Sequence, residues 1–533
     1  MLDVMSTPKA AHSTGAGILE LESGDRKIEA IRTRSFITTA NAALVLLLGI
    51  GGVLRFWNIN TLGYNSDEVV YTGQAAALAG DPTLDKYFPI FRAHPMAYQY
   101  TLSMLFSLFG VHDIIGRSLS ALLGLVTVLL VYRIGADLYG TWTGIVAASI
   151  MAVMPYHVVV TRQVLLDGPL TFCTTLTLLL LVRYALTEKP IYLLGVGSAL
   201  GLTFLTKETG FVFAASTFTF LALTPRIRLR FWTLAGAALC MLIPIVMFPL
   251  SIVLAGRSDT AQSYLVWQLL RPSNHEWSFF LKVVPPAIGW GVVIAAIAGL
   301  IVLRTKRSWR ETLLLSWIVV PALVFQIWSV KGFQYLLPIA PAVAILCART
   351  LIGWQPGWTK RLGSKATWIN VATVIMICIS LGFSSWHVAA MQSTSSHLAG
   401  AGGIPGVRET GEWIDANIPE NAVFMTIGPS MANMIQFYGH RRALGLSVST
   451  NPLNRNPSYQ PLVNPDAQLR YGDVQYIVYD AFSASRSAYF TESLMKYVAK
   501  YHAREIYSFT LPNNASDESS EPVKLIVIYE VRP

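Results

Sequence analysis

Long apolar segments separated by short basic connections are the feature that most constrains this chain. Of its 533 residues, 53% are hydrophobic and only 13% are charged. Soluble globular proteins carry roughly 25% charged residues, and a helix that crosses a bilayer needs about 20 consecutive apolar residues. The composition therefore predicts a polytopic α-helical membrane protein and excludes an ordinary soluble domain.

Hydropathy predicts about eleven transmembrane helices. The apolar segment that begins at His94 and ends at Phe109 contains Ser and Gln and is too short for a comfortable crossing, so we interpret it as a juxtamembrane or re-entrant helix. The predicted spans are 36–57, 115–133, 142–160, 168–186, 190–206, 210–224, 231–254, 283–303, 311–330, 333–351 and 366–390.

The distribution of basic residues sets the orientation of these spans. With residues 1–35 as a cytoplasmic tail, Lys and Arg gather in the loops that would lie inside, as the positive-inside rule requires. The net charge of +10 then reflects membrane topology, and nucleic acid is not an expected partner. The inner-loop residues are Arg133, Arg183, Lys189, Arg226, Arg228, Arg230, Arg304, Lys306, Arg307, Arg310, Lys360, Arg361 and Lys365.

An odd number of spans places the end of the chain outside the cytoplasm. We expect a transmembrane domain over 36–390, with a long first outer loop at 58–114. Residues 391–533 then form a linker, rich in Ser, Gly and Ala over 391–404, and an extracytoplasmic α/β domain. In that domain the sequence predicts strands near 422–426, 474–479 and 524–529, and a helix over 487–501.

The adjacent acids Asp67 and Glu68 begin the more polar part of the first outer loop. Carboxylates beside a membrane are costly and commonly mark chemistry or transport, although a solvated turn is the alternative. Other ionisable groups are predicted to reach the same face from loops far apart in sequence, which favours a shared site. They are His94, Arg162, Asp167, Lys207, Glu208 and Lys331.

Each of these groups also has a structural alternative. Arg162 and Asp167 could form an internal ion pair where two spans meet. Lys207 could pair with Glu208 or extend to the lipid headgroups, and Lys331 could serve as an interfacial anchor. His94, which precedes a proline, could cap the next helix. Sequence spacing alone leaves these alternatives open.

Neither a disulfide framework nor a zinc site is indicated. The four cysteines are far apart and lie in apolar spans, and no cofactor is firmly implied. His275 and Glu276 are two potential metal ligands without a third, so a divalent metal stays an open alternative.

Five short motifs, in order and on one predicted membrane side, resemble those of the GT-C superfamily of membrane glycosyltransferases. The likeness is to the branch of protein O-mannosyltransferases and aminoarabinose transferases, and it covers about 30–390. The motifs are Asp67-Glu68, His94-Pro95-Met96, Arg162 to Asp167, Gly201 with Lys207-Glu208-Thr209-Gly210-Phe211, and Gln334-Tyr335-Leu336-Leu337-Pro338 with Lys331 nearby.

The resemblance implies a GT-C fold, a polyprenyl-phosphate-linked sugar donor and an inverting single displacement. It implies Asp67 as the general base, Glu68 in support, and the donor phosphate near Arg162 and Lys207. A carboxylate among cations suits this chemistry, because a phosphate leaving group needs positive charge and the acceptor needs a base. His94, Asp167, Lys331 and Tyr335 are further candidates for binding substrate.

Two motifs depart from the family pattern. Aminoarabinose transferases have Lys-Pro-Pro where this chain has His94-Pro95-Met96, and Gln334 replaces the usual Arg. The sequence around Trp413-Ile414 resembles that of the outer domains of prokaryotic relatives. This resemblance implies that the protein lies in the cytoplasmic membrane of a prokaryote.

The main hypothesis is therefore a glycosyltransferase that acts at the outer membrane face on an unknown acceptor, which could be protein, lipid or glycan. A transporter or flippase of lipid-linked sugars is a second class, but such proteins often show internal repeats, and none is evident. A polysaccharide polymerase or ligase is a third, supported by Arg271 and His275 in a late outer loop.

Overall fold

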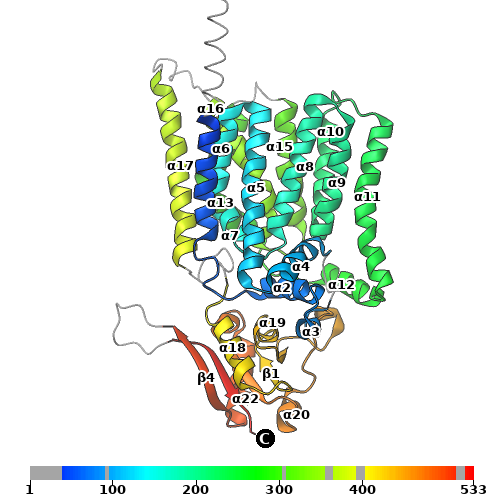
Figure 1. Ribbon diagram of the computed structural model, residues 1–533, viewed down its shortest axis with the longest axis vertical. Helices are drawn as coiled ribbons and strands as arrows, with labels where there is room; N and C mark the ends of the chain where they lie inside the picture. The colour runs from blue at the N-terminus through cyan, green and yellow to red at the C-terminus, as the bar shows by residue number, and fades with distance from the viewer. Residues whose placement is uncertain are drawn as a thin grey trace, which may run out of the picture.

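The computed structural model consists of a helix bundle and a smaller α/β domain that covers one end of the bundle, here called the domain side (Figure 1). It describes residues 39–89, 95–302, 308–353, 364–391, 403–511 and 523–532. The predictions for the tail 1–35, for His94, for most of the linker 391–404, and for residues 304, 306, 307, 360 and 361 lie outside these ranges.

Helices of the described ranges account for every predicted span. Seven are long and apolar enough to cross a membrane, and the number rises to nine if each of two bent pairs is one crossing. Two shorter apolar segments, Pro190–Thr206 and Glu208–Leu223, overlap the remaining two predicted spans. The chain is thus an integral membrane protein, and the total of eleven crossings stays a prediction.

The bundle is built from the following elements. The first helix is Thr39–Phe56, followed by α5 (Asp113–Tyr139), α6 (Thr141–Val153), α7 (Pro155–Thr161), α8 (Asp167–Thr187), α9 (Pro190–Thr206), η1 (Glu208–Phe211), α10 (Val212–Leu223), α11 (Phe231–Leu254), α13 (Phe279–Ile288), α14 (Trp290–Val302), α15 (Trp309–Ile327), η3 (Phe333–Ile339), α16 (Ala340–Gly353) and α17 (Ser364–Met391).

Two predicted spans are bent rather than straight. Helices α6 and α7 meet at 58°. Pro155 begins α7 there, and a proline offers no N–H to continue the α6 hydrogen-bond ladder. Helices α13 and α14 meet at 97°. Between them Gly289 has φ 102°, a conformation that favours glycine.

The first outer loop predicted at 58–114 is largely helical. It contains α2 (Ser66–Leu78), α3 (Pro82–Asp85) and α4 (Ala97–Phe109), which lie across the domain side together with α12 (Ser258–Leu270) (Figure 1). Helix α2 begins with a capping box, in which the Asn65 side chain accepts from two backbone N–H groups and Glu68 accepts from the Asn65 N–H. Helix α4 occupies the segment expected to be juxtamembrane.

The smaller domain is a mixed α/β fold, as expected from the alternation of apolar runs and turns. Its sheet has the strand order β2-β1-β3-β5-β4, with β1 parallel to β2 and β3 and with β5 antiparallel to β3 and β4. The elements are α18 (Val407–Asn417), β1 (Val423–Thr426), α19 (Pro429–Tyr438), β2 (Arg442–Gly445), η5 (Pro452–Asn454), α20 (Pro465–Arg470), β3 (Tyr476–Asp480), α21 (Ala481–Ala484), α22 (Ala488–Lys500), β4 (Arg504–Leu511) and β5 (Val523–Glu530).

The three predicted strands correspond to β1, β3 and β5, and the predicted helix to α22. Strands β2 and β4 were not expected. The sequence of β2, Arg442–Gly445, is short and ends in glycine, whereas β4, Arg504–Leu511, carries several charged and polar residues. Neither shows the apolar run that marks a buried strand.

A polar junction joins the domain to the bundle. Both the Nε and an Nη group of Arg408 donate to an Asp113 carboxylate oxygen, at 3.1 and 2.6 Å, and the Tyr438 hydroxyl donates to the same oxygen at 2.5 Å. The N–H of Ile404 also donates to the carbonyl oxygen of Gly63 at 3.3 Å, in an isolated antiparallel bridge. The domain is therefore attached to the chain just before α2.

Replacing Arg408 should loosen this junction. Hydrogen bonds to charged groups contribute roughly 1.5–3 kcal/mol each, so Arg408→Ala is expected to speed amide hydrogen exchange at the Gly63–Ile404 bridge by about tenfold or more, since 1.4 kcal/mol is a factor of ten. The control is Arg532→Ala, which removes an ion pair with Glu530. The Arg532 side chain is 71% exposed, so this variant should leave that exchange unchanged. Equal exchange in both variants would contradict the assigned role of Arg408.

Candidate functional site

Glu68 is fully buried and is held by four hydrogen bonds. Arg117 donates to both of its carboxylate oxygens at 2.9 Å, and the N–H groups of Asn65 and Val164 each donate at 3.0 Å. Arg117 also donates to the carbonyl oxygens of residues 59, 62 and 63, so all five of its N–H groups have acceptors. The buried Glu68–Arg117 pair thereby fixes the start of α2 against the bundle.

Asp67, the neighbouring acid, is exposed in the first turn of α2. One helical turn later, Tyr71 lies within electrostatic range of Asp67 and Asp167. Burial raises the pKa of the Tyr71 hydroxyl well above its usual range, and the two carboxylates raise it further, so Tyr71 remains protonated at neutral pH. Of the two adjacent acids, only Asp67 has a carboxylate open to solvent.

Asp167 and Lys207 form a second buried pair beside Asp67. The Lys207 ammonium donates to both carboxylate oxygens of Asp167 at 2.8 and 2.9 Å. It also lies 4.7 Å from the centre of the Tyr335 ring, a cation–π contact. Tyr335 is in turn within electrostatic range of Asp67. The structure thus brings four of the predicted residues together: Asp67, Asp167, Lys207 and Tyr335.

This geometry corrects one of the alternatives raised by the sequence. Asp167 is the partner of Lys207, so the alternative pairing of Arg162 with Asp167 is wrong. Glu208 also lies within electrostatic range of Lys207. Helix packing explains the observed pair, because Asp167 in the first turn of α8 faces Lys207 at the end of α9.

Arg162 is buried and caps the end of the first helix. Its two terminal nitrogens donate to the carbonyl oxygens of Leu54, Arg55 and Trp57 at 2.8–3.0 Å. These are carbonyls that a helix end leaves without an intrahelical partner. Arg162 therefore stabilises the end of the first helix. Its predicted contact with a donor phosphate stays a prediction.

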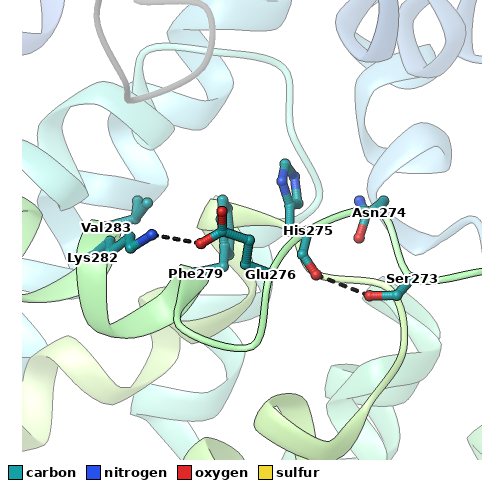
Figure 2. A pocket seen from close by; sticks show the side chains of 7 residues that line it. All are labelled: Ser273, Asn274, His275, Glu276, Phe279, Lys282 and Val283. Atoms are coloured by element: carbon teal, nitrogen blue, oxygen red, sulfur yellow. Dashed lines mark hydrogen bonds and ion pairs between the residues drawn. The ribbon is translucent and has the colours of Figure 1, made fainter.

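Lys331 is hydrogen-bonded to Asn274, which lines a pocket of ≈ 480 Å³ formed by α13 and the segment before it. Its backbone is hydrogen-bonded to the Asn274 side chain at 2.8 and 2.9 Å, and its ammonium donates to the carbonyl oxygen of Trp328 at 3.2 Å. In the same pocket His275 stacks on Phe279 at 4.0 Å, and Lys282 pairs with Glu276 (Figure 2). Partial burial and Lys331 lower the pKa of His275.

Two cations not proposed as binding residues lie near the cluster. Arg271, which ends α12, is within electrostatic range of Tyr335 and Tyr264. Arg486, in the α/β domain just after α21, is within electrostatic range of Asp67. Arg271 was visible as a basic residue in a late loop. Arg486 offered no signal, because nothing in a single sequence places a domain residue over a distant loop.

Within the ranges that the structure describes, no group of three or more His, Cys, Asp or Glu side chains is arranged to hold a metal ion. Glu276 of the proposed two-ligand set is engaged with Lys282 and Ser278.

The fold of this chain is similar to the folds of several solved structures. The fold is similar to that of ArnT from Cupriavidus metallidurans in the apo state, with a TM-score of 0.66 and 14% identity over 92% of this chain and 98% of that one. The same enzyme bound to undecaprenyl phosphate gives a TM-score of 0.64, with 15% identity over 91% and 97% of the two chains. The oligosaccharyltransferase AglB from Archaeoglobus fulgidus, in complex with an inhibitory peptide and a dolichol-phosphate, gives 0.58, with 12% identity over 91% and 75%.

The sequence comparison is more specific. Residues 93–251 match the family model described as dolichyl-phosphate-mannose-protein mannosyltransferase. An uncharacterized protein of Aquifex aeolicus (strain VF5) is 26% identical over 349 residues, which is 62% of this chain and 68% of that protein. Residues 93–251 therefore resemble that mannosyltransferase family, and the fold is similar to that of ArnT.

Removing both Asp167 and Lys207 should lower the stability of the protein less than removing Lys207 alone. Lys207→Met leaves a buried carboxylate without its cation and should lower stability by about 3–5 kcal/mol, whereas Lys207→Met with Asp167→Leu should recover most of that loss. Thermal unfolding of the detergent-solubilised protein measures both. The control is Lys282→Met, whose pair with Glu276 is 64% and 74% exposed, and it should shift stability by about 0–1 kcal/mol. A Lys207→Met shift no larger than that of the control would show that the pair is not buried as described.

Proposed function

We propose that this protein transfers a sugar from a polyprenyl-phosphate donor to an acceptor hydroxyl or amine, with inversion, and that Asp67 is the general base. The observation that carries the proposal is the position of Asp67. It is a carboxylate open to solvent, near the buried Asp167–Lys207 pair and the partly buried Tyr335.

In the proposed reaction, the Asp67 carboxylate takes the proton of the acceptor as the acceptor atom bonds to the anomeric carbon. The bond from that carbon to the phosphate oxygen breaks at the same time, and polyprenyl phosphate leaves with the electron pair. No proton donor is needed for this leaving group, because nearby cations stabilise its charge. The Glu68–Arg117 pair does not touch the reacting atoms and acts by holding Asp67 in place.

Arg271 is the cation best suited to receive the donor phosphate. Lys207 already donates two of its three N–H groups to Asp167, and the Arg162 terminal nitrogens are engaged with backbone carbonyls. Arg271 is partly exposed at the end of α12, where it stacks on Trp267 at 4.8 Å. We therefore assign the phosphate to Arg271, with the third Lys207 N–H as a second donor.

The orientation of the site belongs to the same proposal. The far ends of α5, α8 and α10, opposite the domain side, are followed by or contain the basic residues counted as inner-loop charges, among them Arg133, Arg183 and Arg226. Such a distribution supports a cytoplasmic far side and an extracytoplasmic domain side. The donor would then be used at the outer face of the membrane.

Asp67→Asn should abolish most of the transfer without weakening donor binding. Loss of a general base costs roughly 10²–10⁴-fold in rate, so single-turnover transfer from a panel of polyprenyl-phosphate sugars should fall by that factor. Asp85→Asn changes another exposed aspartate of the same loop region and should act like the wild type. Transfer in Asp67→Asn at more than a third of the wild-type rate would remove Asp67 from the role of base.

Arg271→Met should instead weaken the binding of the donor. Loss of a charged hydrogen bond of roughly 1.5–3 kcal/mol corresponds to an increase of about 10- to 100-fold in the Kd for polyprenyl phosphate, measured by titration in detergent. Arg257→Met, at the opposite end of α12, is the matched control. An unchanged Kd in Arg271→Met, with a raised Kd in Lys331→Met, would move the phosphate to the 480 Å³ pocket beside His275.

A further inference from the structure

The α/β domain contains a small pocket next to the segment that carries Asp67. It has a volume of ≈ 170 Å³ and is lined mostly by apolar side chains, including those of Met431, Met434 and Ile526. Ile404 also lines it, and the Ile404 N–H donates to the carbonyl of Gly63, four residues before Asp67. One wall of the pocket is thus hydrogen-bonded to the base of the loop that holds the proposed catalytic acid.

One oxygen of a carboxylate in this apolar lining has no hydrogen-bond donor among the described residues. Asp480 ends β3 and is 4% exposed. Its Oδ1 accepts from the Ser483 N–H at 2.7 Å and so caps α21. No described residue donates a hydrogen bond to its buried Oδ2. A buried oxygen without a donor is costly, and a ligand that brings an N–H or O–H group into the pocket would remove that cost.

Arg486 connects this pocket to Asp67. Its guanidinium lies 3.8 Å from the centre of the Phe482 ring, and Phe482 lines the pocket. The same guanidinium is within electrostatic range of both Asp67 and Asp480. Burial raises the pKa of Asp480, while its hydrogen bonds with Ser483 and the charge of Arg486 act in the opposite direction. Arg486 therefore contacts a residue that lines the pocket and lies within electrostatic range of the proposed base.

We propose that this pocket is the acceptor subsite of the enzyme and that it takes an apolar side chain of a polypeptide acceptor, with Asp480 Oδ2 receiving a backbone N–H of that peptide. Arg486 and Phe482 form the passage between the pocket and Asp67. This proposal rests on the proposed function, and it gives the α/β domain a direct part in choosing the acceptor.

The size and chemistry of the pocket favour a peptide over the other acceptor classes. A saccharide brings many hydroxyl groups, each of which needs a partner when buried, whereas the lining offers mainly Asp480 and Ser485. A lipid acceptor would place a long chain in a cavity of only ≈ 170 Å³. A peptide offers one apolar side chain next to one N–H donor, which matches both features of the pocket.

Binding of labelled peptides tests the proposal without any donor sugar. The probes are two fluorescein-labelled peptides, Gly-Ser-Leu-Ser-Gly and Gly-Ser-Asp-Ser-Gly, titrated by anisotropy into the full-length protein in nanodiscs. The leucine peptide should bind about tenfold or more tightly than the aspartate peptide, because burying an extra carboxylate beside Asp480 is unfavourable. Asp480→Asn and Ser485→Trp should each weaken binding of the leucine peptide by about tenfold, which is 1.4 kcal/mol.

Ser485→Trp keeps the test independent of folding, because Ser485 is exposed at the edge of the pocket. The control is Asp466→Asn, in an exposed ion-pair cluster of the same domain, which should bind the peptide like the wild type. Leucine-peptide affinity within twofold of the wild type in both pocket variants would overturn the proposal. Tighter binding of lipid A vesicles or maltoheptaose, lost in those two variants, would also overturn it in favour of another acceptor class.

Failure of this proposal and failure of the proposed function give different results. If the wild type transfers sugar and the two pocket variants keep its acceptor KM, the pocket is not the acceptor subsite, although the enzyme reaction stands. If the peptide binds through Asp480 and no polyprenyl-phosphate sugar is transferred, the pocket assignment stands and the reaction does not.

Discussion

Four hydrogen bonds hold the Glu68 carboxylate inside the protein, and the arrangement of the site depends on them. The donors come from Arg117, from Asn65 at the start of α2, and from Val164, just before α8. Three segments far apart in sequence therefore meet at one side chain. A buried charge pair of this kind is costly unless its hydrogen bonds are complete, and here both partners are fully engaged.

The two adjacent acids therefore have different roles: Glu68 stabilises the structure, and Asp67 is the acid exposed to solvent. The Glu68 side chain is buried and hydrogen-bonded, which fixes the start of α2, and Asp67 at the preceding position of the helix is exposed to solvent. The neighbouring pair of Asp167 and Lys207 is nearly neutral as a unit, with both partners buried. Arg271 and Arg486 are more exposed. In the proposed reaction, the donor approaches Asp67 from α12 and the acceptor approaches it from the α/β domain.

The α/β domain takes part in this arrangement because its attachment is polar and specific. Arg408 and Tyr438 both donate to Asp113, the first residue of α5, and α5 also carries Arg117. A single helix end thus connects the domain to the residue that orients α2. Displacing the domain would disturb the Glu68 environment as well as remove Arg486 from Asp67.

The bundle, three of the five strands of the α/β domain and the grouping of Asp67 with Asp167, Lys207 and Tyr335 were predictable, because hydropathy, strand patterning and membrane side can be judged along the chain. Which acid faced inward was not predictable by topology alone. The capping box of Asn65 and Glu68 did offer a signal, since it requires Glu68 to turn back toward the backbone. Arg162 and Arg486 could not be placed, because capping a distant helix and reaching over from another domain depend on tertiary packing.

A double-variant cycle on single-turnover transfer tests the central claim most directly. If Glu68 acts only by holding Asp67, Glu68→Gln should slow transfer in the wild type but have almost no further effect in Asp67→Asn, so that the two free-energy costs are strongly non-additive. The unfolding temperature of each variant, measured in parallel, separates this effect from loss of the fold. Costs that simply add would show that Glu68 contributes to the reaction independently of Asp67, and would contradict the account.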